Sequence, residues 1–260
     1  MLPTSSMLRA CSCVLTFGLM MPAVSVRAGV ITTADGNGAD AFVRGTGTWN
    51  HYADTNFGNA DTVKIKHIGN LGDCRKAYLR FDLSGVSSEV LAATLKLTLD
   101  GGTTEGFSYN VYGLLDGHPG ENWVEGDGGS DNSPLGELTW NNAPANFTTW
   151  GNGVIDSETW DLGYYSVAAN TSAGTVVNFS GNNLLSFLNA DTNDLATFLI
   201  TRRGPYSQRL GNQIRTKENT LGAPPTLDLT LAPVPEPSTF LIWSIVGLVG
   251  IAWYRKRQRR

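Results

Sequence analysis

Cysteine is scarce in this chain. Its 260 residues include three cysteines, and Cys11 and Cys13 lie in an apolar N-terminal segment that we expect to be removed. Cys74 then has no partner, which excludes an internal disulfide and a cysteine-based zinc site. A single thiol in an exported protein is either buried or used between molecules, and we expect Cys74 to be buried.

The motifs of common catalytic sites are also missing. The histidines are scattered without a His-Glu-x-x-His spacing, and the chain has no Gly-x-Ser-x-Gly elbow and no phosphate-binding loop. Glu121 with Glu125 or Asp127 would be the carboxylate pair of a glycosidase, and Tyr206 beside Arg202 would suit a polysaccharide lyase. Acidic or basic loops commonly supply such groupings, so we expect no enzymatic activity.

Positive charge is absent from the middle of the chain. No lysine or arginine occurs between Lys96 and Arg202, whereas acidic residues are frequent there. An acidic, exported body argues against a nucleic-acid partner. The bases instead form two groups, which are Lys64, Lys66, Arg75, Lys76, Arg80 and Lys96, and Arg202, Arg203, Arg209, Arg215 and Lys217.

The N-terminal residues predict export. Residues 8–23 are mostly apolar, and Val26-Arg27-Ala28 fits the small-x-small rule for signal-peptide cleavage. We therefore expect a signal peptide over residues 1–28, a mature chain that begins at Gly29, and the Sec translocon as a partner.

The C-terminal residues combine Pro235-Glu236-Pro237, an uncharged run over 240–254 and a basic end over 255–260. Crossing a bilayer core takes roughly 20 apolar residues, so the run is short, but we expect it to form a transmembrane helix with its basic end in the cytoplasm. The pattern resembles the PEP-CTERM sorting signal of Gram-negative bacteria, here over residues 233–260.

That resemblance implies an exosortase as the processing partner. It also implies attachment to the inner membrane before processing, and the cell surface or extracellular matrix as the destination. The alternative is an ordinary C-terminal membrane anchor.

Residues 29–232 predict one all-β domain. Apolar and polar residues alternate over 63–68, 77–83, 93–99 and 226–231, as in antiparallel strands with one face on a core. Glycine and asparagine turns separate these from further expected strands at 41–44, 108–114, 157–162, 175–179 and 196–201. One short helix is expected over 184–189. Many short strands between turns predict a sandwich or barrel.

Several motifs are spread along this domain. They are Ala39-Asp40-Ala41-Phe42-Val43-Arg44, Asn56-Phe57-Gly58-Asn59, residues 75–83, residues 92–97, Trp123-Val124-Glu125-Gly126, residues 138–144 and residues 225–229. Together they resemble the DNRLRE family of secreted modules, which is related to carbohydrate-binding modules. The resemblance implies an antiparallel, jelly-roll-like β-sandwich without catalytic activity, and some relatives bind acidic polysaccharides such as alginate. Residues 45–60 and 146–161 fit it least.

The two basic groups point to an anionic glycan. Lys64 and Lys66 lie two residues apart and share a side of their predicted strand, so a neighbouring strand with Arg80 would extend a basic stripe across a solvent face. Arginine binds carboxylates in bidentate fashion, and aromatic rings can stack on sugars. The predicted glycan-binding residues are Lys64, Lys66, Arg75, Tyr78, Arg80, Arg202, Arg203 and Tyr206. The alternative is that these bases only solvate amphipathic strands.

Two acidic, glycine-rich loops offer hard oxygen ligands, which suit Ca²⁺. Asp35 and Asp40 lie in the first loop, and Asp127 and Asp131 lie in the second. These four residues are the candidate ligands of a structural calcium ion, and solvated turns are the alternative, since the EF-hand spacing is absent. Trp123 and Trp140 bracket the second loop and are expected to anchor the core.

The sequence thus predicts an exported, exosortase-sorted β-sandwich that binds or associates with extracellular, acidic polysaccharide and has no enzymatic activity. A small polysaccharide-degrading enzyme and a purely structural matrix protein are the alternatives.

Overall fold

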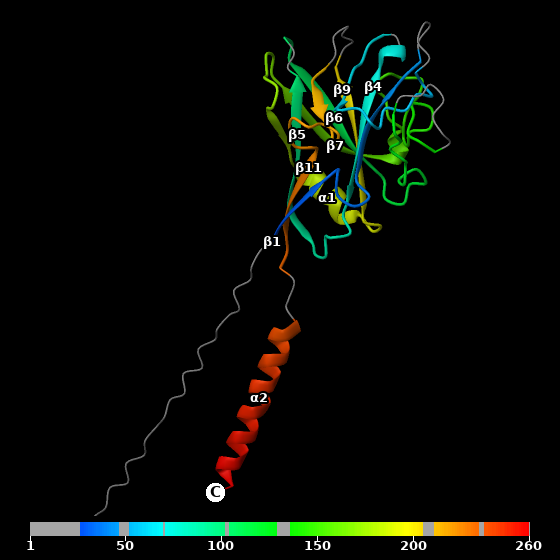
Figure 1. Cartoon of the computed structure of the whole chain (residues 1–260). Helices are drawn as coiled ribbons and strands as arrows, with labels where there is room; N and C mark the ends of the chain where they lie inside the picture. Colours follow the sequence, from blue (N-terminus) through cyan, green and yellow to red (C-terminus); the bar gives the residue numbers. More distant parts are fainter. Residues whose placement is uncertain are drawn as a thin grey trace, which may run out of the picture.

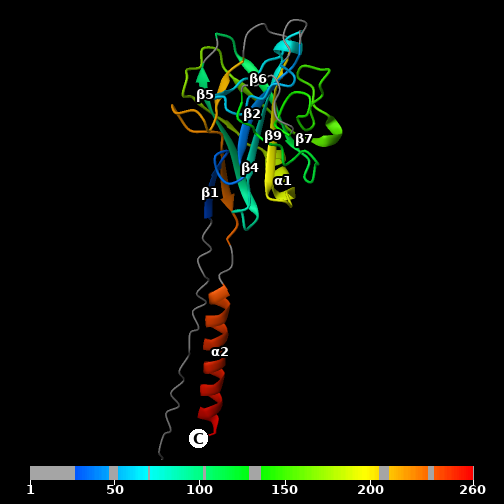
Figure 2. The same ribbon diagram turned by 45° about the vertical axis from the view of Figure 1, so that its right-hand side comes forward.

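Two antiparallel sheets form the body of the protein in the computed structural model, which describes residues 27–46, 52–69, 71–101, 104–128, 136–204, 211–233 and 237–259 (Figure 1). The first sheet has the order β1 (Arg27–Thr32), β11 (Thr226–Leu231), β5 (Val90–Gly101), β10 (Gln213–Arg215) and β3 (Thr62–Val63), with β8 (Val176–Phe179) also paired to β5. The second sheet has the order β2 (Ala39–Arg44), β4 (Arg75–Asp82), β9 (Leu195–Arg203), β6 (Phe107–Leu114) and β7 (Thr159–Val167) (Figure 2). The predicted antiparallel sandwich is confirmed, and its jelly-roll connectivity stays a prediction.

Most of the predicted strands are present, and the short helix is confirmed as α1 (Asn182–Ala190). The predicted strand over 63–68 was wrong, because β3 ends at Val63 and Lys66 makes a single further bridge, to Arg75. The alternation there arises because Val63 and Ile65 are both fully buried, although the backbone between them leaves the ladder. The predicted strand at 157–162 begins later, after the 3₁₀ turn η2 (Asp156–Glu158).

A single apolar core fills the space between the sheets. In β4 the side chains of Ala77, Leu79 and Phe81 point into it, as period-two alternation requires. Helix α1 closes this core against β5 and β7, and Phe187 from α1 stacks edge-on against Phe198 at a centroid distance of 5.4 Å. A methyl group at Gly113 would lie 2.4 Å from the Phe187 ring, so β6 carries a glycine where the helix packs closest.

A second apolar cluster lies on the outer face of the second sheet. There Tyr78 and Leu199 pack against Trp123, Leu138 and Trp140, which come from the long segment of residues 115–158 (green, at the right of Figure 1). The prediction that both tryptophans are core anchors is confirmed. Cys74 is fully buried in the same cluster, as expected. This part of the outer face is therefore a second core and not a solvent face.

Lys76 fastens the long segment to the sheet. Its side chain is fully buried, and its Nζ donates toward Asn146 Oδ1 at 2.6 Å and toward the carbonyl oxygens of Phe147, Trp150 and Gly153 at 3.3, 3.2 and 2.5 Å. The ammonium also lies 4.5 Å from the centre of the Trp140 ring. Burial lowers the pKa of Lys76 to about 7, and the charge interaction with Cys74 acts in the opposite direction.

The C-terminal run forms α2 (Pro237–Gln258), which lies apart from the sheets (Figure 1). Across the described residues, no helix combines the length and the apolar character needed to cross a membrane. The predicted transmembrane helix is therefore not found. The uncharged run covers only residues 240–254, and Arg255, Lys256 and Arg257 occupy the last turn of the helix.

Pro235 and Glu236 of the predicted sorting motif lie outside the described residues, and Pro237 is the first residue of α2. Strand β1 begins at Arg27, whose register partner is Leu231. Cleavage after Ala28 stays a prediction.

Replacing Lys76 by methionine tests its role in the fold. Lys76→Met leaves the side-chain oxygen of Asn146 and three carbonyl oxygens without their shared donor, so we expect the free energy of unfolding to fall by about 2–3 kcal/mol. Urea denaturation of the purified protein measures this loss. Lys96→Met is the matched control, because Lys96 pairs with Asp228 at the surface and should cost less than about 1 kcal/mol. Equal losses in both variants would contradict the anchoring role.

Candidate functional site

An open cleft of about 640 Å³ lies on the outer face of the second sheet, beside the tip of the long segment. It is lined by His67, Asn110, Tyr112, Phe147, Trp150, Asn152, Gly153, Val154, Asp156 and Gly204. Trp150 is 60% exposed and Phe147 is 43% exposed, although both are large apolar residues. Aromatic faces beside a few amide and carboxylate groups form the kind of surface that holds a polar ligand with flat apolar faces.

The tip of the long segment is held from beneath. Lys76 contacts the carbonyl oxygens on both sides of Gly151, at Trp150 and Gly153. A methyl group at Gly151 would lie 2.2 Å from Cys74 Sγ, so the backbone packs directly on the buried thiol. Asn152 Nδ2 donates to the carbonyl oxygen of Arg202 at 3.1 Å. These contacts place the Trp150 ring on a supported loop, which lowers the conformational entropy lost on binding.

Arg203 is the last residue of β9 and lies next to the cleft, since the following residue, Gly204, is part of the lining. Its guanidinium carbon lies 4.1 Å from the centre of the exposed Tyr164 ring, and its Nη1 donates to Asn110 Oδ1 at 3.2 Å. The sheet register explains this meeting, because Asn110 of β6 pairs with Tyr164 of β7 and with Thr201 of β9. Of the predicted glycan-binding residues that the structure describes, Arg203 alone is classed as exposed.

Lys66 and Arg75 lie together, as the prediction of a basic group implies. Both contact Asp73, at 3.3 and 3.5 Å, and Arg44 joins them at 2.8 Å. Burial alone would raise the pKa of Asp73, but these three cations lower it overall. Three positive charges around one carboxylate leave an excess of positive charge. His67, which follows Lys66 in the chain, lines the cleft, whereas no residue of this cluster does.

The predicted basic stripe across a solvent face was wrong. Lys64 is half-buried, follows β3 of the first sheet and points its Nζ toward the Phe42 ring, 5.9 Å from the ring centre. Arg80 belongs to the second sheet, and its side chain donates to the carbonyl oxygens of Asn37 at 2.8 Å and Trp123 at 2.6 Å. The stripe fails because its members belong to different sheets and because residues 115–158 cover Arg80.

Two further predicted binding residues, Tyr78 and Arg202, are buried. Tyr78 is fully buried and donates to the carbonyl oxygen of Pro144 at 3.0 Å. Arg202 is 6% exposed and lies over the Phe107 ring, with its guanidinium carbon 3.4 Å from the ring centre. Tyr206 lies outside the described residues.

Reasoning from the sequence missed the aromatic part of the cleft. Phe147 and Trp150 lie in a segment rich in asparagine and glycine, and two aromatic residues in such a loop are a signal that exposed rings occur there. The positions of Tyr112 in the cleft and of Tyr164 against Arg203 could not be predicted, because both depend on which strands are neighbours.

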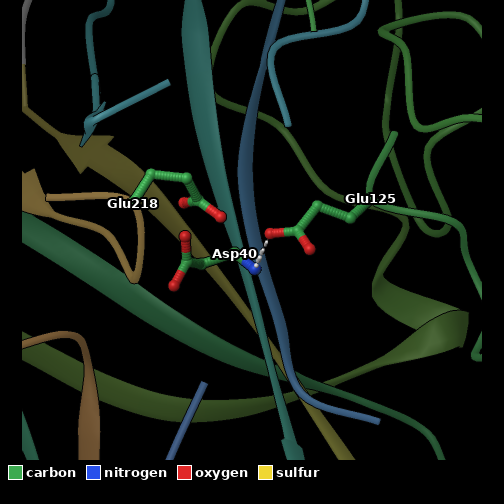
Figure 3. A group of neighbouring side chains, drawn as sticks. All are labelled: Asp40, Glu125 and Glu218. Carbon is green, nitrogen blue, oxygen red and sulfur yellow. Dashed lines mark hydrogen bonds between the residues drawn. The ribbon is translucent and has the colours of Figure 1, made fainter. Parts of the chain in front are cut away.

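The acidic residues form groups different from those predicted. Asp40 lies with Glu125 and Glu218, one carboxylate oxygen of each within 4.8 Å of the others (Figure 3). Burial, together with the neighbouring carboxylates of Glu218 and Glu125, raises the pKa of Asp40 to about 7. Asp35 and Asp127 do not join this group. Asp35 is exposed and accepts hydrogen bonds from Thr32, Asp127 is exposed, and Asp131 lies outside the described residues.

The carboxylates considered for a glycosidase are placed in separate groups. Glu121 lies with Asp116 and Asp191 and accepts hydrogen bonds from Gly117 N at 3.1 Å and Asn193 Nδ2 at 2.5 Å. Glu125 lies instead with Asp40 and Glu218. A hydrolytic pair needs two carboxyl groups that flank one bond, and these two carboxylates are engaged with different neighbours.

Comparison with known protein families shows which family the chain belongs to. Residues 33–169 match carbohydrate-binding module family 96, which is more than half of the chain and includes β2, β4, β5, β6, β7 and the long segment. No curated protein is significantly similar to the chain.

Among solved structures, a recombinantly expressed latent aurone synthase (polyphenol oxidase) is similar at 13% identity and a TM-score of 0.30, over 62% of this chain and 25% of that one. The chain spans about a quarter of that protein's length, and a likeness this low carries no argument about function. The family match covers the residues that line the cleft except Gly204, and it ends before Arg203. The chain belongs to carbohydrate-binding module family 96.

Proposed function

We propose that this protein is a non-catalytic module that binds extracellular polysaccharide in the cleft beside Trp150. The observation that carries the proposal is an exposed tryptophan on a loop that Lys76 and Cys74 support from beneath. A pyranose ring has flat apolar faces that pack on such an indole, while its hydroxyl groups bond to amides. Asn110 and Asn152 supply amides within the same cleft, and Asp156 supplies a carboxylate that accepts hydrogen bonds from hydroxyl groups.

The preferred polysaccharide is an acidic one. Arg203 presents an exposed guanidinium next to the cleft, and such a group binds a uronate carboxylate in bidentate fashion. The excess positive charge around Asp73 adds a favourable field on the side of the cleft near His67. Asp156 is the opposing charge, which places the carboxylates of the sugar nearer Arg203 than Asp156.

The N- and C-terminal segments support an exported protein whose tail is a sorting signal. An apolar leader precedes the β-body, and Pro-Glu-Pro precedes an uncharged helix with a basic end. We propose that exosortase removes this tail, and that the protein then acts at the cell surface or in the extracellular matrix.

Trp150→Ala tests the cleft. Loss of the indole removes the stacking surface, so we expect binding to a polyuronate such as alginate to weaken by about tenfold or more, which is about 1.4 kcal/mol. Affinity electrophoresis or calorimetry with purified protein measures the change. Trp253→Ala, in full-length protein produced in a host without exosortase, is the matched control, because Trp253 is an exposed tryptophan of α2.

Three results would contradict the proposed function. Equal affinity of Trp150→Ala and wild type would remove the cleft as the binding site. Release of sugar fragments from alginate by the wild-type protein would favour the enzyme instead, and binding to none of the polysaccharides tested would favour a structural matrix role.

Arg203→Gln tests the preference for acidic sugars. The variant keeps a hydrogen-bonding side chain but loses the charge, so binding to alginate should weaken by roughly three- to tenfold and become less sensitive to salt. Binding to a neutral β-glucan should not change. Arg257→Gln in α2 should behave as wild type, and an equal effect of both variants would indicate a non-specific charge effect.

The mass of the mature protein tests sorting. Intact mass spectrometry of protein recovered from the producing cells should show a chain that begins at Gly29 and lacks Trp243 and Trp253. Deletion of the exosortase should restore the tail. A mature protein that keeps both tryptophans in exosortase-positive cells would show that the tail is not removed.

A further inference from the structure

Three carboxylates converge where three distant segments of the chain meet. Asp40 comes from β2 of the second sheet, Glu125 from the long segment, and Glu218 from the loop that follows β10 of the first sheet. One oxygen from each lies within 4.8 Å of the other two. Figure 3 shows the three side chains reaching the same region from separate ribbons, with the Asp40 carboxylate beside that of Glu218 and the Glu125 carboxylate at the Asp40 backbone nitrogen.

Some of these oxygens have hydrogen-bond donors. Asp40 Oδ2 accepts from Thr33 Oγ1 and, at 3.1 Å, from the backbone N–H of Lys217. Glu125 Oε1 accepts from the backbone N–H of Asp40 at 2.8 Å, and Glu125 Oε2 pairs with Lys217 Nζ.

Two buried oxygens lack a donor. Asp40 Oδ1 and Glu218 Oε2 are both inaccessible to solvent and have no hydrogen-bond partner among the described residues. Asp40 itself is fully buried, and Figure 3 shows its carboxylate facing that of Glu218. A buried carboxylate oxygen without a partner is costly, so the arrangement calls for a positively charged group between these two side chains.

The net charge of the three carboxylates and the type of their ligand atoms indicate which positively charged group would fit. The three carboxylates carry more negative charge than the Lys217 ammonium and the nearby Arg80 guanidinium balance, and a divalent cation would compensate the remainder. All the side-chain ligands are hard oxygens, which suit Ca²⁺ or Mg²⁺ and not zinc or copper. Ca²⁺ accepts irregular sets of protein oxygens more readily than Mg²⁺, which keeps most of its waters in octahedral geometry.

We propose that Asp40, Glu125 and Glu218 bind one Ca²⁺ ion that joins the two sheets and the long segment. Water completes the coordination shell. None of the three residues lines the cleft, so the ion stabilises the fold and does not contact the polysaccharide. This set replaces the predicted ligands Asp35, Asp127 and Asp131, and it retains Asp40.

Calcium titration of the chelator-treated, purified full-length protein tests the proposal. We expect calorimetry to show one Ca²⁺ bound per chain, with weaker binding of Mg²⁺. When free Ca²⁺ is 100 times the dissociation constant, the ratio of folded to unfolded protein should rise about 100-fold, which is seen as a higher Tm.

Glu218→Gln should weaken Ca²⁺ binding by at least tenfold and abolish the rise in Tm. In chelator its Tm should equal or exceed that of the wild type, because one of the mutually repelling carboxylates is gone. Asp191→Asn is the matched control, since it removes a carboxylate from the separate group with Asp116 and Glu121. It should bind Ca²⁺ as the wild type does.

Several results would overturn the proposal. They are the absence of saturable Ca²⁺ binding by the wild type, equal binding by Glu218→Gln, and loss of binding in Asp191→Asn but not in Glu218→Gln. The wild-type titration decides the matter even if Glu218→Gln does not fold.

Discussion

The burial of one ammonium group, that of Lys76, organises the functional half of this protein. The long segment of residues 115–158 has little regular structure, so many of its carbonyl oxygens lack partners within the segment. Lys76 rises from the centre of a sheet and meets three of these carbonyls together with the Asn146 amide oxygen. Without that donor, the segment would have to leave these groups buried without partners or lift away from the sheet.

Covering the outer face of the second sheet has consequences for the other charged residues. Arg80 is enclosed by the segment and bonds to its carbonyls, and Tyr78 does the same through its hydroxyl group. The polar groups of Arg80 and Tyr78 hold the loop on the sheet through these hydrogen bonds, so they are not available to a ligand. The segment ends its coverage near β6, where Asn110 and the stacked pair of Arg203 and Tyr164 come to the surface. The boundary between the covered and uncovered parts of this face is the cleft.

Hydrogen bonds between segments that are distant in sequence also position the acidic residues. Asn56 from one of the family-like motifs is 1% exposed and bonds to the carbonyl oxygens of Glu125 and Leu138, while its own oxygen accepts from Gly58 and Gly128. This arrangement holds Glu125 opposite Asp40. The proposed calcium ion would satisfy the oxygens that remain, and it would fasten the same long segment at a second place, well apart in sequence from the residues that Lys76 contacts.

The sequence by itself determined most of the strands, the burial of Cys74 and the two anchoring tryptophans, because each depends on local alternation or on a residue's own chemistry. It also indicated the kind of module through motifs that are continuous along the chain. It did not indicate the strands β1 and β10. It did not determine which charged residues are free, since Lys76, Arg80 and Arg203 have the same local pattern of basic residues in strands. Only the tertiary structure decided that a loop covers the first two and leaves the third exposed. The cleft and the carboxylate group were likewise decided there, because each joins residues whose proximity follows from sheet order and not from spacing along the chain.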